Sequence, residues 1–241
     1  MYNWTATQRI LAVTTFFVGL LLMLSILPYQ ADDAYITYQY AKNILVGNGF
    51  VFNANDPAVE GFSSPLWLAI LVLGGTLFGV SALPSIAALA GVFSYLGIGF
   101  LAWRISRSNA ACLLRIAILI SIIPGICYYA ITGLDQILFV FFVAYGAKIY
   151  VEGRSGKFHI PLFFLAAWAR PEAPAIIAIG IVILLLKYRQ DFKSALVEWI
   201  KISAPLISGY VALIFIRAVI FSDIFPNTYY AKQPELASGI Q

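Results

Sequence analysis

Long apolar segments alternate with short polar segments along nearly the whole chain. The apolar runs lie at about 10–28, 64–80, 84–103, 116–131, 136–147, 160–169, 173–186 and 202–221. Hydrophobic residues make up 61% of the 241 positions, charged residues make up only 11%, and the mean hydropathy is +0.88. A soluble domain of this length is far more polar. We therefore predict an all-α polytopic membrane protein in which residues 1–241 form a single transmembrane domain.

The basic residues between the runs predict how the chain crosses the membrane. Cytoplasmic loops carry an excess of lysine and arginine, and basic clusters lie at about 104–115, 148–157 and 187–201. Arg9 precedes the first run, which is too long for the core of an ordinary signal peptide and predicts an uncleaved span. The topology that satisfies the rule has spans at 10–28, 84–103, 116–131, 136–147 and 202–221, a broken hairpin at 160–186, and an extracytoplasmic loop at 29–80.

An ordinary span at residues 64–79 would conflict with the positive-inside rule, because two crossings between 64 and 103 would put the later basic clusters outside. We expect this segment to lie in the outer leaflet or to dip into it. The alternative is two ordinary spans with the basic clusters outside, since the positive-inside rule is a bias. In the preferred topology the outward exceptions among the basic residues are Lys42, Arg170, Arg217 and Lys232. The net charge of +4 then reflects topology, so we expect no nucleic-acid partner.

The first outer loop opens with the segment QADDAYITYQYAKN, whose spacing predicts an interfacial helix on the membrane surface. Asp32 and Asp33 stand where this helix should begin. One interpretation is helix capping, since an Asp side chain accepts a backbone hydrogen bond there. A second carboxylate adds repulsion unless a cation or a substrate hydroxyl is shared, which favours a catalytic site. Both interpretations remain open at this point.

Three of the other acidic residues that face outward in the predicted topology are candidate site residues. Glu60 is either a polar contact or a solvated loop charge, and Asp135 is either a helix cap or a functional acid in a tight turn. Glu172 belongs to the segment WARPEAPA, which lies between apolar runs of about ten and fourteen residues. Arg170 and Glu172 should therefore lie in or near the membrane, where ionisable groups are usually functional. The alternative is an arginine–glutamate pair that neutralises itself and holds a turn.

Outward carboxylates, an arginine at membrane depth and interfacial tyrosines suit a lipid substrate that carries a phosphate. A polyprenyl-phosphate sugar presents its anionic leaving group at the headgroup level, and Asp32 or Asp33 could accept the proton of the acceptor hydroxyl. Arg170, with Arg217 or Lys232, is the candidate donor-phosphate site, and a divalent cation such as Mg or Mn could share this role. Contacts to substrate or metal are then expected from Glu60, Asp135 and Glu172.

The segments DDAYITYQYAKN, VEGFSSPLW, TGLDQILF, WARPEA and PNTYYAK occur in this order. Together they resemble the motifs of bacterial integral-membrane glycosyltransferases of the C-type fold (GT-C), particularly the group that includes the mycobacterial terminal arabinofuranosyltransferase. The resemblance implies a GT-C-like transmembrane bundle with interfacial helices in the first extracytoplasmic loop. It also implies a catalytic base in the Asp32–Asp33 pair, a polyprenyl-phosphate sugar donor, and an extracytoplasmic glycan or glycolipid acceptor.

The sequence departs from this pattern in three places. Residues 133–135 read Gly-Leu-Asp where the family usually has Gly-Leu-Glu, and Ala173 follows Arg-Pro-Glu in place of glycine. The chain also stops shortly after Lys232, so we expect it to lack the C-terminal part of the family. Two other functions fit the same residues, namely a transporter or flippase for a lipid-linked anion and a non-catalytic fragment of such an enzyme. The expected location is the inner (plasma) membrane, with several crossings and an active site on the extracytoplasmic face.

Overall fold

The computed structural model describes residues 6–105, 124–152, 157–187 and 191–224. Helices account for all the regular structure in these residues, and they include no strand. The helices are α1 (Ala6–Ile26), α2 (Asp32–Leu45), α3 (Pro65–Phe78), a 3₁₀ turn η1 (Val80–Ala82), α4 (Leu83–Ile105), α6 (Pro124–Ile131), α7 (Gln136–Glu152), α8 (His159–Ala169), α9 (Ala173–Lys187) and α10 (Phe192–Phe221). The predicted all-α class is therefore confirmed for the described residues.

Two described helices are long and apolar enough to cross a membrane, namely Val80–Arg104 and Phe192–Phe221. The pair α6 and α7 also passes the length and composition test together, although it bends by 106° at the break between the two helices. The described residues thus contain two or three candidate spans, which is compatible with a helical membrane protein. The other crossings and their directions stay predictions.

Helix α10 is longer than the span predicted at 202–221. Its 30 residues rise about 45 Å, whereas the hydrocarbon core of a bilayer is about 30 Å thick. Asp191 sets the early start, because its side chain accepts a hydrogen bond from the backbone N–H of Ser194 at 3.0 Å and caps the helix. Both ends of the helix therefore have room to extend into the polar regions that border the hydrocarbon.

Helix α3 coincides with the segment expected not to cross. Its 14 residues rise about 21 Å, which is less than the hydrocarbon thickness. Pro65 occupies its first turn, and the Ser64 side chain accepts a hydrogen bond from the backbone N–H of Trp67 at 3.2 Å. The position of α3 relative to a membrane stays a prediction.

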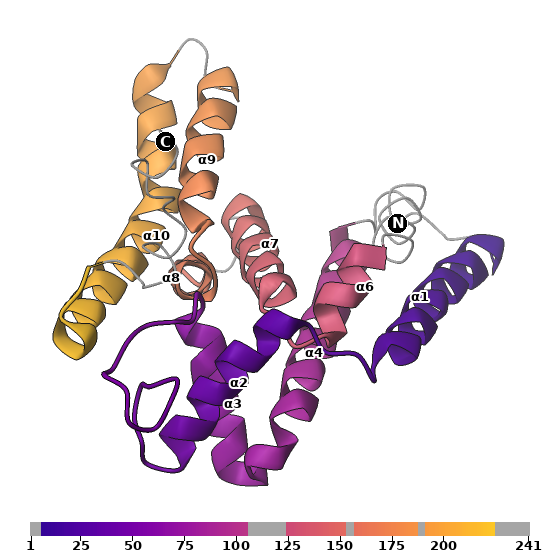
Figure 1. The fold of residues 1–241 in the computed structure, drawn as a ribbon. Coiled ribbons are helices and arrows are strands. Elements are labelled where there is room, and N and C mark those ends of the chain that lie inside the picture. Colours follow the sequence, from indigo (N-terminus) through magenta and orange to yellow (C-terminus); the bar gives the residue numbers. More distant parts are fainter. Residues whose placement is uncertain (1–5, 106–123, 153–156, 188–190, 225–241) are drawn as a thin grey trace, which may run out of the picture.

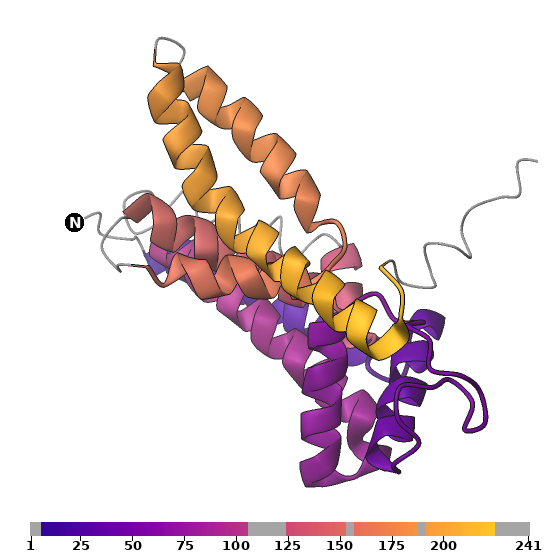
Figure 2. The same cartoon turned by 90° about the vertical axis from the view of Figure 1, so that its left-hand side faces the viewer.

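The helices gather around three apolar clusters. Helices α2, α3 and the start of α4 enclose the first cluster, α1, α4 and α6 share the second, and α8, α9 and α10 share the third. Figures 1 and 2 both show α2 and α3 at one end of the molecule and the α9–α10 hairpin extending from the other end. Many large apolar side chains of α1, α4, α9 and α10 are exposed, as expected for helices whose solvent is lipid.

Candidate functional site

Asp32 and Asp33 form the first turn of α2, and both side chains are exposed. The capping interpretation is wrong, because Ala31 occupies the N-cap position and no side chain caps this helix. No hydrogen bond or ion pair joins either carboxylate to another described residue. Two adjacent acids are thus presented at a helix start without a structural task beyond their favourable interaction with the helix dipole.

Hydrogen bonds join the start of α2 to the turn between α6 and α7. The backbone N–H of Ala31 donates to the carbonyl of Thr132 at 3.0 Å. The Tyr38 hydroxyl donates to the Gln30 side-chain oxygen at 2.6 Å, and the Gln30 amide reaches the carbonyl of Ile131 at 3.4 Å. Burial raises the pKa of Tyr38 well above its usual value, so its hydroxyl remains a donor. The carboxylate pair is therefore held against residues 131–135 although it lies about a hundred positions earlier in the chain.

The turn between α6 and α7 approaches α2 most closely at Gly133. Its φ of 88° belongs to the left-handed region that favours glycine. A Cβ atom there would lie 2.1 Å from the Tyr38 hydroxyl and 2.8 Å from the Ala34 Cβ. The carbonyl of Gly133 accepts a hydrogen bond from the Trp67 indole at 3.0 Å, which adds α3 to the same junction. A side chain at position 133 would therefore push α2 away from the turn.

Two residues beyond Gly133, the carboxylate of Asp135 is paired with Arg170. The guanidinium Nη1 of Arg170 lies 2.7 Å from Asp135 Oδ1, and Asp135 is only 6% exposed. The same guanidinium holds Glu172 through Nε at 2.8 Å and Nη2 at 2.6 Å. The predicted self-neutralising pair of Arg170 and Glu172 is therefore present, with Asp135 as a third member. Two carboxylates thus share one guanidinium.

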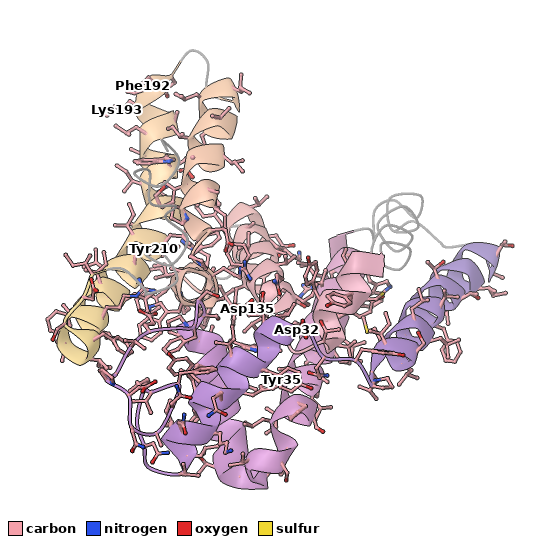
Figure 3. All side chains as sticks on the ribbon, viewed as in Figure 1. Asp32, Tyr35, Asp135, Phe192, Lys193 and Tyr210 are labelled. Atoms are coloured by element: carbon pink, nitrogen blue, oxygen red, sulfur yellow. The ribbon has the colours of Figure 1, made fainter. Side chains whose placement is uncertain are left out.

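The backbone of the Arg170 turn is held by α10. The Tyr210 hydroxyl donates to the carbonyl oxygens of Arg170 at 3.1 Å and Pro171 at 2.7 Å. Two residues before Arg170, the Trp168 indole donates to the carbonyl of Gly209 at 3.0 Å. The two bonds from Tyr210 satisfy carbonyls at the break between α8 and α9, and the bond from Trp168 joins the end of α8 to the middle of α10. Figure 3 shows Asp32 on α2, Asp135 near the start of that helix, and Tyr210 on α10.

Glu60 and Arg217 form a buried ion pair at some distance along the chain from both clusters. Arg217 Nε lies 2.6 Å and Nη2 lies 3.0 Å from the two Glu60 oxygens, which is a bidentate arrangement. Glu60 is 4% exposed and Arg217 is 8% exposed. Beside the pair, the backbone N–H of Gly61 donates to the Tyr40 hydroxyl at 3.1 Å. The pair therefore connects the loop between α2 and α3 to α10, and the interpretation of Glu60 as a solvated loop charge is wrong.

The remaining predicted residue, Lys232, lies outside the described residues. No group of three His, Cys, Asp or Glu side chains that could hold a metal ion occurs in the described parts of the chain. The donor-phosphate roles of Arg170 and Arg217 and the substrate roles of the acids stay predictions. The structure adds the contacts of Arg170, Arg217 and their acidic partners described above.

Sequence reasoning missed the residues that position the site. Gln30, Tyr38, Gly133, Trp67 and Tyr210 act through hydrogen bonds and close packing. Gly133 carried a signal, because a glycine before an acid in a tight interhelical turn suggests a left-handed backbone. The tyrosine and tryptophan contacts join segments that are far apart in sequence, and nothing in their local pattern specifies the partner.

The described residues form an all-helical protein with two or three candidate membrane spans and an exposed acidic pair beside paired charges, which is compatible with a helical membrane protein. No family model matches the chain, and no solved structure matches it. The terminal beta-(1->2)-arabinofuranosyltransferase of Mycobacterium tuberculosis is 28% identical to it over 224 residues. The alignment covers 84% of this chain and 34% of that enzyme, so the chain spans about a third of the length of the relative. This similarity relates the chain, distantly, to a glycosyltransferase.

Proposed function

We propose that the chain acts as a membrane glycosyltransferase of the GT-C type, transferring a sugar from a polyprenyl-phosphate donor to an extracytoplasmic glycan or glycolipid acceptor. The observation that carries the proposal is the contrast between acids. Glu60, Asp135 and Glu172 are held by arginines, whereas the carboxylates of Asp32 and Asp33 are exposed and form no hydrogen bond or ion pair with other described residues. A general base needs a free lone pair within reach of the acceptor hydroxyl. The distant similarity to an arabinofuranosyltransferase supports the reaction class.

In the proposed step, the acceptor hydroxyl oxygen bonds to the anomeric carbon of the donor sugar. The bond from that carbon to the phosphate oxygen breaks, and the lipid phosphate leaves with the electron pair. Asp32 or Asp33 accepts the proton of the acceptor hydroxyl. Arg170 is the better candidate for the phosphate, because its side chain is 18% exposed and two of its nitrogens are held by Glu172, whose side chain is 55% exposed and can give way to a phosphate. Lys232 is a second candidate.

Arg217 has a different role in this proposal. Both of its hydrogen-bonded nitrogens are occupied by Glu60 in a buried pair. Releasing it toward a phosphate would leave a buried carboxylate unpaired, at a cost of several kcal/mol. We assign Arg217 and Glu60 to positioning the loop. We assign no step to Mg or Mn, although a carboxylate pair such as Asp32–Asp33 could hold such an ion together with the donor phosphate.

The proposed location is the inner membrane, with the reaction on the extracytoplasmic face. This orientation follows from placing the basic clusters inside, which puts the Asp32–Asp33 pair at the outer surface. A polyprenyl-phosphate sugar can present its phosphate at this surface while its lipid tail stays in the bilayer.

The experiment is sugar transfer in membranes that contain the chain, with a panel of radiolabelled polyprenyl-phosphate sugars. Wild type is compared with Asp32→Asn and Asp33→Asn at matched protein levels. Donor-dependent transfer that either substitution abolishes supports the proposal. Absence of transfer with every donor, in a chain shown to be inserted and folded, would favour the non-catalytic fragment. A parallel sample with EDTA tests the predicted Mg or Mn requirement separately.

A transporter for a lipid-linked anion is the second candidate. The 106° bend between α6 and α7 favours it, because broken helices often line substrate sites in transporters. Movement of a fluorescent polyprenyl phosphate across vesicle membranes, without any sugar transfer, would establish this function in place of the first.

A further inference from the structure

The exposed tyrosines gather at one place in the molecule. Among the described residues, the tyrosines with large exposed side chains are Tyr29 at 68%, Tyr35 at 57%, Tyr129 at 40% and Tyr128 at 38%. We call these four the tyrosine cluster. Every other described tyrosine is buried or partly buried. Exposure is therefore a property of this location and not of tyrosine in general.

The location is the junction that holds the carboxylate pair. The hydrogen bond from Ala31 to Thr132 joins the start of α2 to the end of α6. Tyr29 and Tyr35 lie within four residues of Ala31, and the other two members lie within four residues of Thr132. Two separate segments of the chain thus bring exposed aromatic rings to the same junction.

Tyr35 is the member closest to the proposed chemistry. It stands three residues after Asp32 on α2, a spacing that places two side chains on one helix face. Figure 3 shows the two residues near one another on this helix. Its ring meets the ring of Tyr38 edge to face, with centroids 5.7 Å apart. Because Tyr38 is buried and bonded to Gln30, it gives Tyr35 a fixed support.

A rigid exposed aromatic ring beside a carboxylate is a surface suited to a sugar. The C–H face of a sugar ring packs on the ring, while its hydroxyls bond to carboxylates and phenols. We propose that the tyrosine cluster binds a sugar ring of the acceptor glycan, with Tyr35 stacking on the ring beside Asp32. The assignment of the sugar to the acceptor rests on the proposed glycosyltransferase function, whereas the binding surface itself does not.

Tyrosines at a membrane interface offer a competing explanation, because they are enriched at the headgroup level. An interfacial role is served by many amphipathic or apolar side chains, whereas stacking on a sugar requires an aromatic face. Tyr35→Phe and Tyr35→Leu therefore separate the two. Trp103, 41% exposed at the far end of α4, provides the matched control Trp103→Leu.

The binding experiment uses the whole chain in lipid nanodiscs without any donor. Saturation-transfer NMR is recorded with the methyl glycosides of arabinofuranose, mannose and glucose. We expect saturation of the sugar ring protons with at least one glycoside, retained in Tyr35→Phe and Trp103→Leu. Binding should weaken by about three- to tenfold in Tyr35→Leu, as expected for the loss of one aromatic contact. Absence of binding to all three, or equal binding by Tyr35→Leu and wild type, would overturn the inference.

A second assay keeps this inference separate from the proposed function. Release of labelled sugar from a polyprenyl-phosphate donor to water requires no acceptor. If the chain cleaves the donor but Tyr35→Leu leaves the acceptor KM unchanged, the tyrosine cluster does not bind the acceptor sugar, and the glycosyltransferase function is retained. Glycoside binding that depends on Tyr35, in a chain that cleaves no donor, would retain the surface and remove the transferase.

Discussion

Five acidic residues of the predicted outer side fall into two groups that the structure treats differently. Glu60, Asp135 and Glu172 each lie within 2.7 Å of an arginine nitrogen. Asp32 and Asp33 are exposed, and the described residues supply neither a cap interaction nor an ion pair for them. In the first group, Glu60 joins a loop to α10, Asp135 joins the turn after α6 to the turn after α8, and Glu172 pairs within that second turn. The carboxylates of the second group join no other described residue.

The two groups of acids should differ in what they contribute, because paired acids stabilise the fold and unpaired acids are available for chemistry. An arginine partner stabilises the charged form of a carboxylate and lowers its value as a base. Removing a paired acid should therefore damage the fold, while removing an unpaired acid should damage only the reaction. Asp32 and Asp33 are also held at a fixed place, because Ala31 is bonded to Thr132. A positioned but unpaired carboxylate is what general base catalysis requires.

The largest expected effect is on activity at the unpaired acids. Substitution of the base, Asp32→Asn or Asp33→Asn, should lower the transfer rate by about 10²–10⁴-fold, because the amide cannot accept the acceptor proton. The unfolding free energy should change by less than about 0.5 kcal/mol, as at other surface positions. Initial rates with a radiolabelled donor and unfolding in SDS titrations measure the two quantities. A variant that loses activity and stability together would assign the pair to the structural group.

The buried pair should show the opposite behaviour. Arg217→Gln or Glu60→Gln leaves one buried charge without its partner, which typically costs about 3–5 kcal/mol of unfolding free energy. The double substitution Glu60→Leu with Arg217→Met should recover most of this loss, since an apolar pair needs no partner. SDS titration of the four proteins gives the result. A single variant with unchanged stability would contradict the assignment of the pair to positioning.

Gly133 tests whether the junction places the unpaired acids. Gly133→Ala should cost about 1–3 kcal/mol, because its φ of 88° is unfavourable for alanine and its Cβ would collide with the Tyr38 hydroxyl. Activity should fall further than stability predicts, since α2 must shift to admit the methyl group. Gly180→Ala is the control, because no atom lies within 4 Å of a Cβ at that position of α9. Transfer rate and SDS unfolding are measured on both variants. Equal effects at the two glycines would show that the junction at Gly133 does not position Asp32 and Asp33.

Much of the helical framework could be predicted from the sequence, because apolar run length and glycine or proline breaks are local properties. The pattern around Asp32 predicted α2, and the short run at 64–79 matches α3 closely. The break at residues 170–172 was visible from Pro171. These features depend on residues only a few positions away, so one sequence is enough to read them.

The pairing of charges could not be predicted in the same way. Glu60 and Arg217 lie 157 positions apart, and Asp135 and Arg170 lie 35 apart. Which acid meets which arginine depends on how the helices pack, and the sequence offered several outward acids for a few outward bases. The Asp191 cap of α10 was also missed, because the basic residues after it suggested a loop before the span.

Asp191 supplies the smallest and most local test of the comparison, since it is another aspartate at a helix start. Unlike Asp32, it caps its helix, and hydrogen bonds from Ser194 hold the pKa of its carboxyl below the usual value. A lowered pKa stabilises the fold fully above the unfolded pKa of about 3.9, and this contribution disappears as the pH falls through the folded value. Asp191→Ala should therefore reduce stability slightly at neutral pH and by progressively less below about pH 4. Asp32→Asn, measured by the same SDS titrations over the same pH range, should follow wild type throughout. If Asp32→Asn instead reproduced the pH dependence of Asp191→Ala, Asp32 would be a structural acid and the proposed base would have to be sought in Asp33 alone.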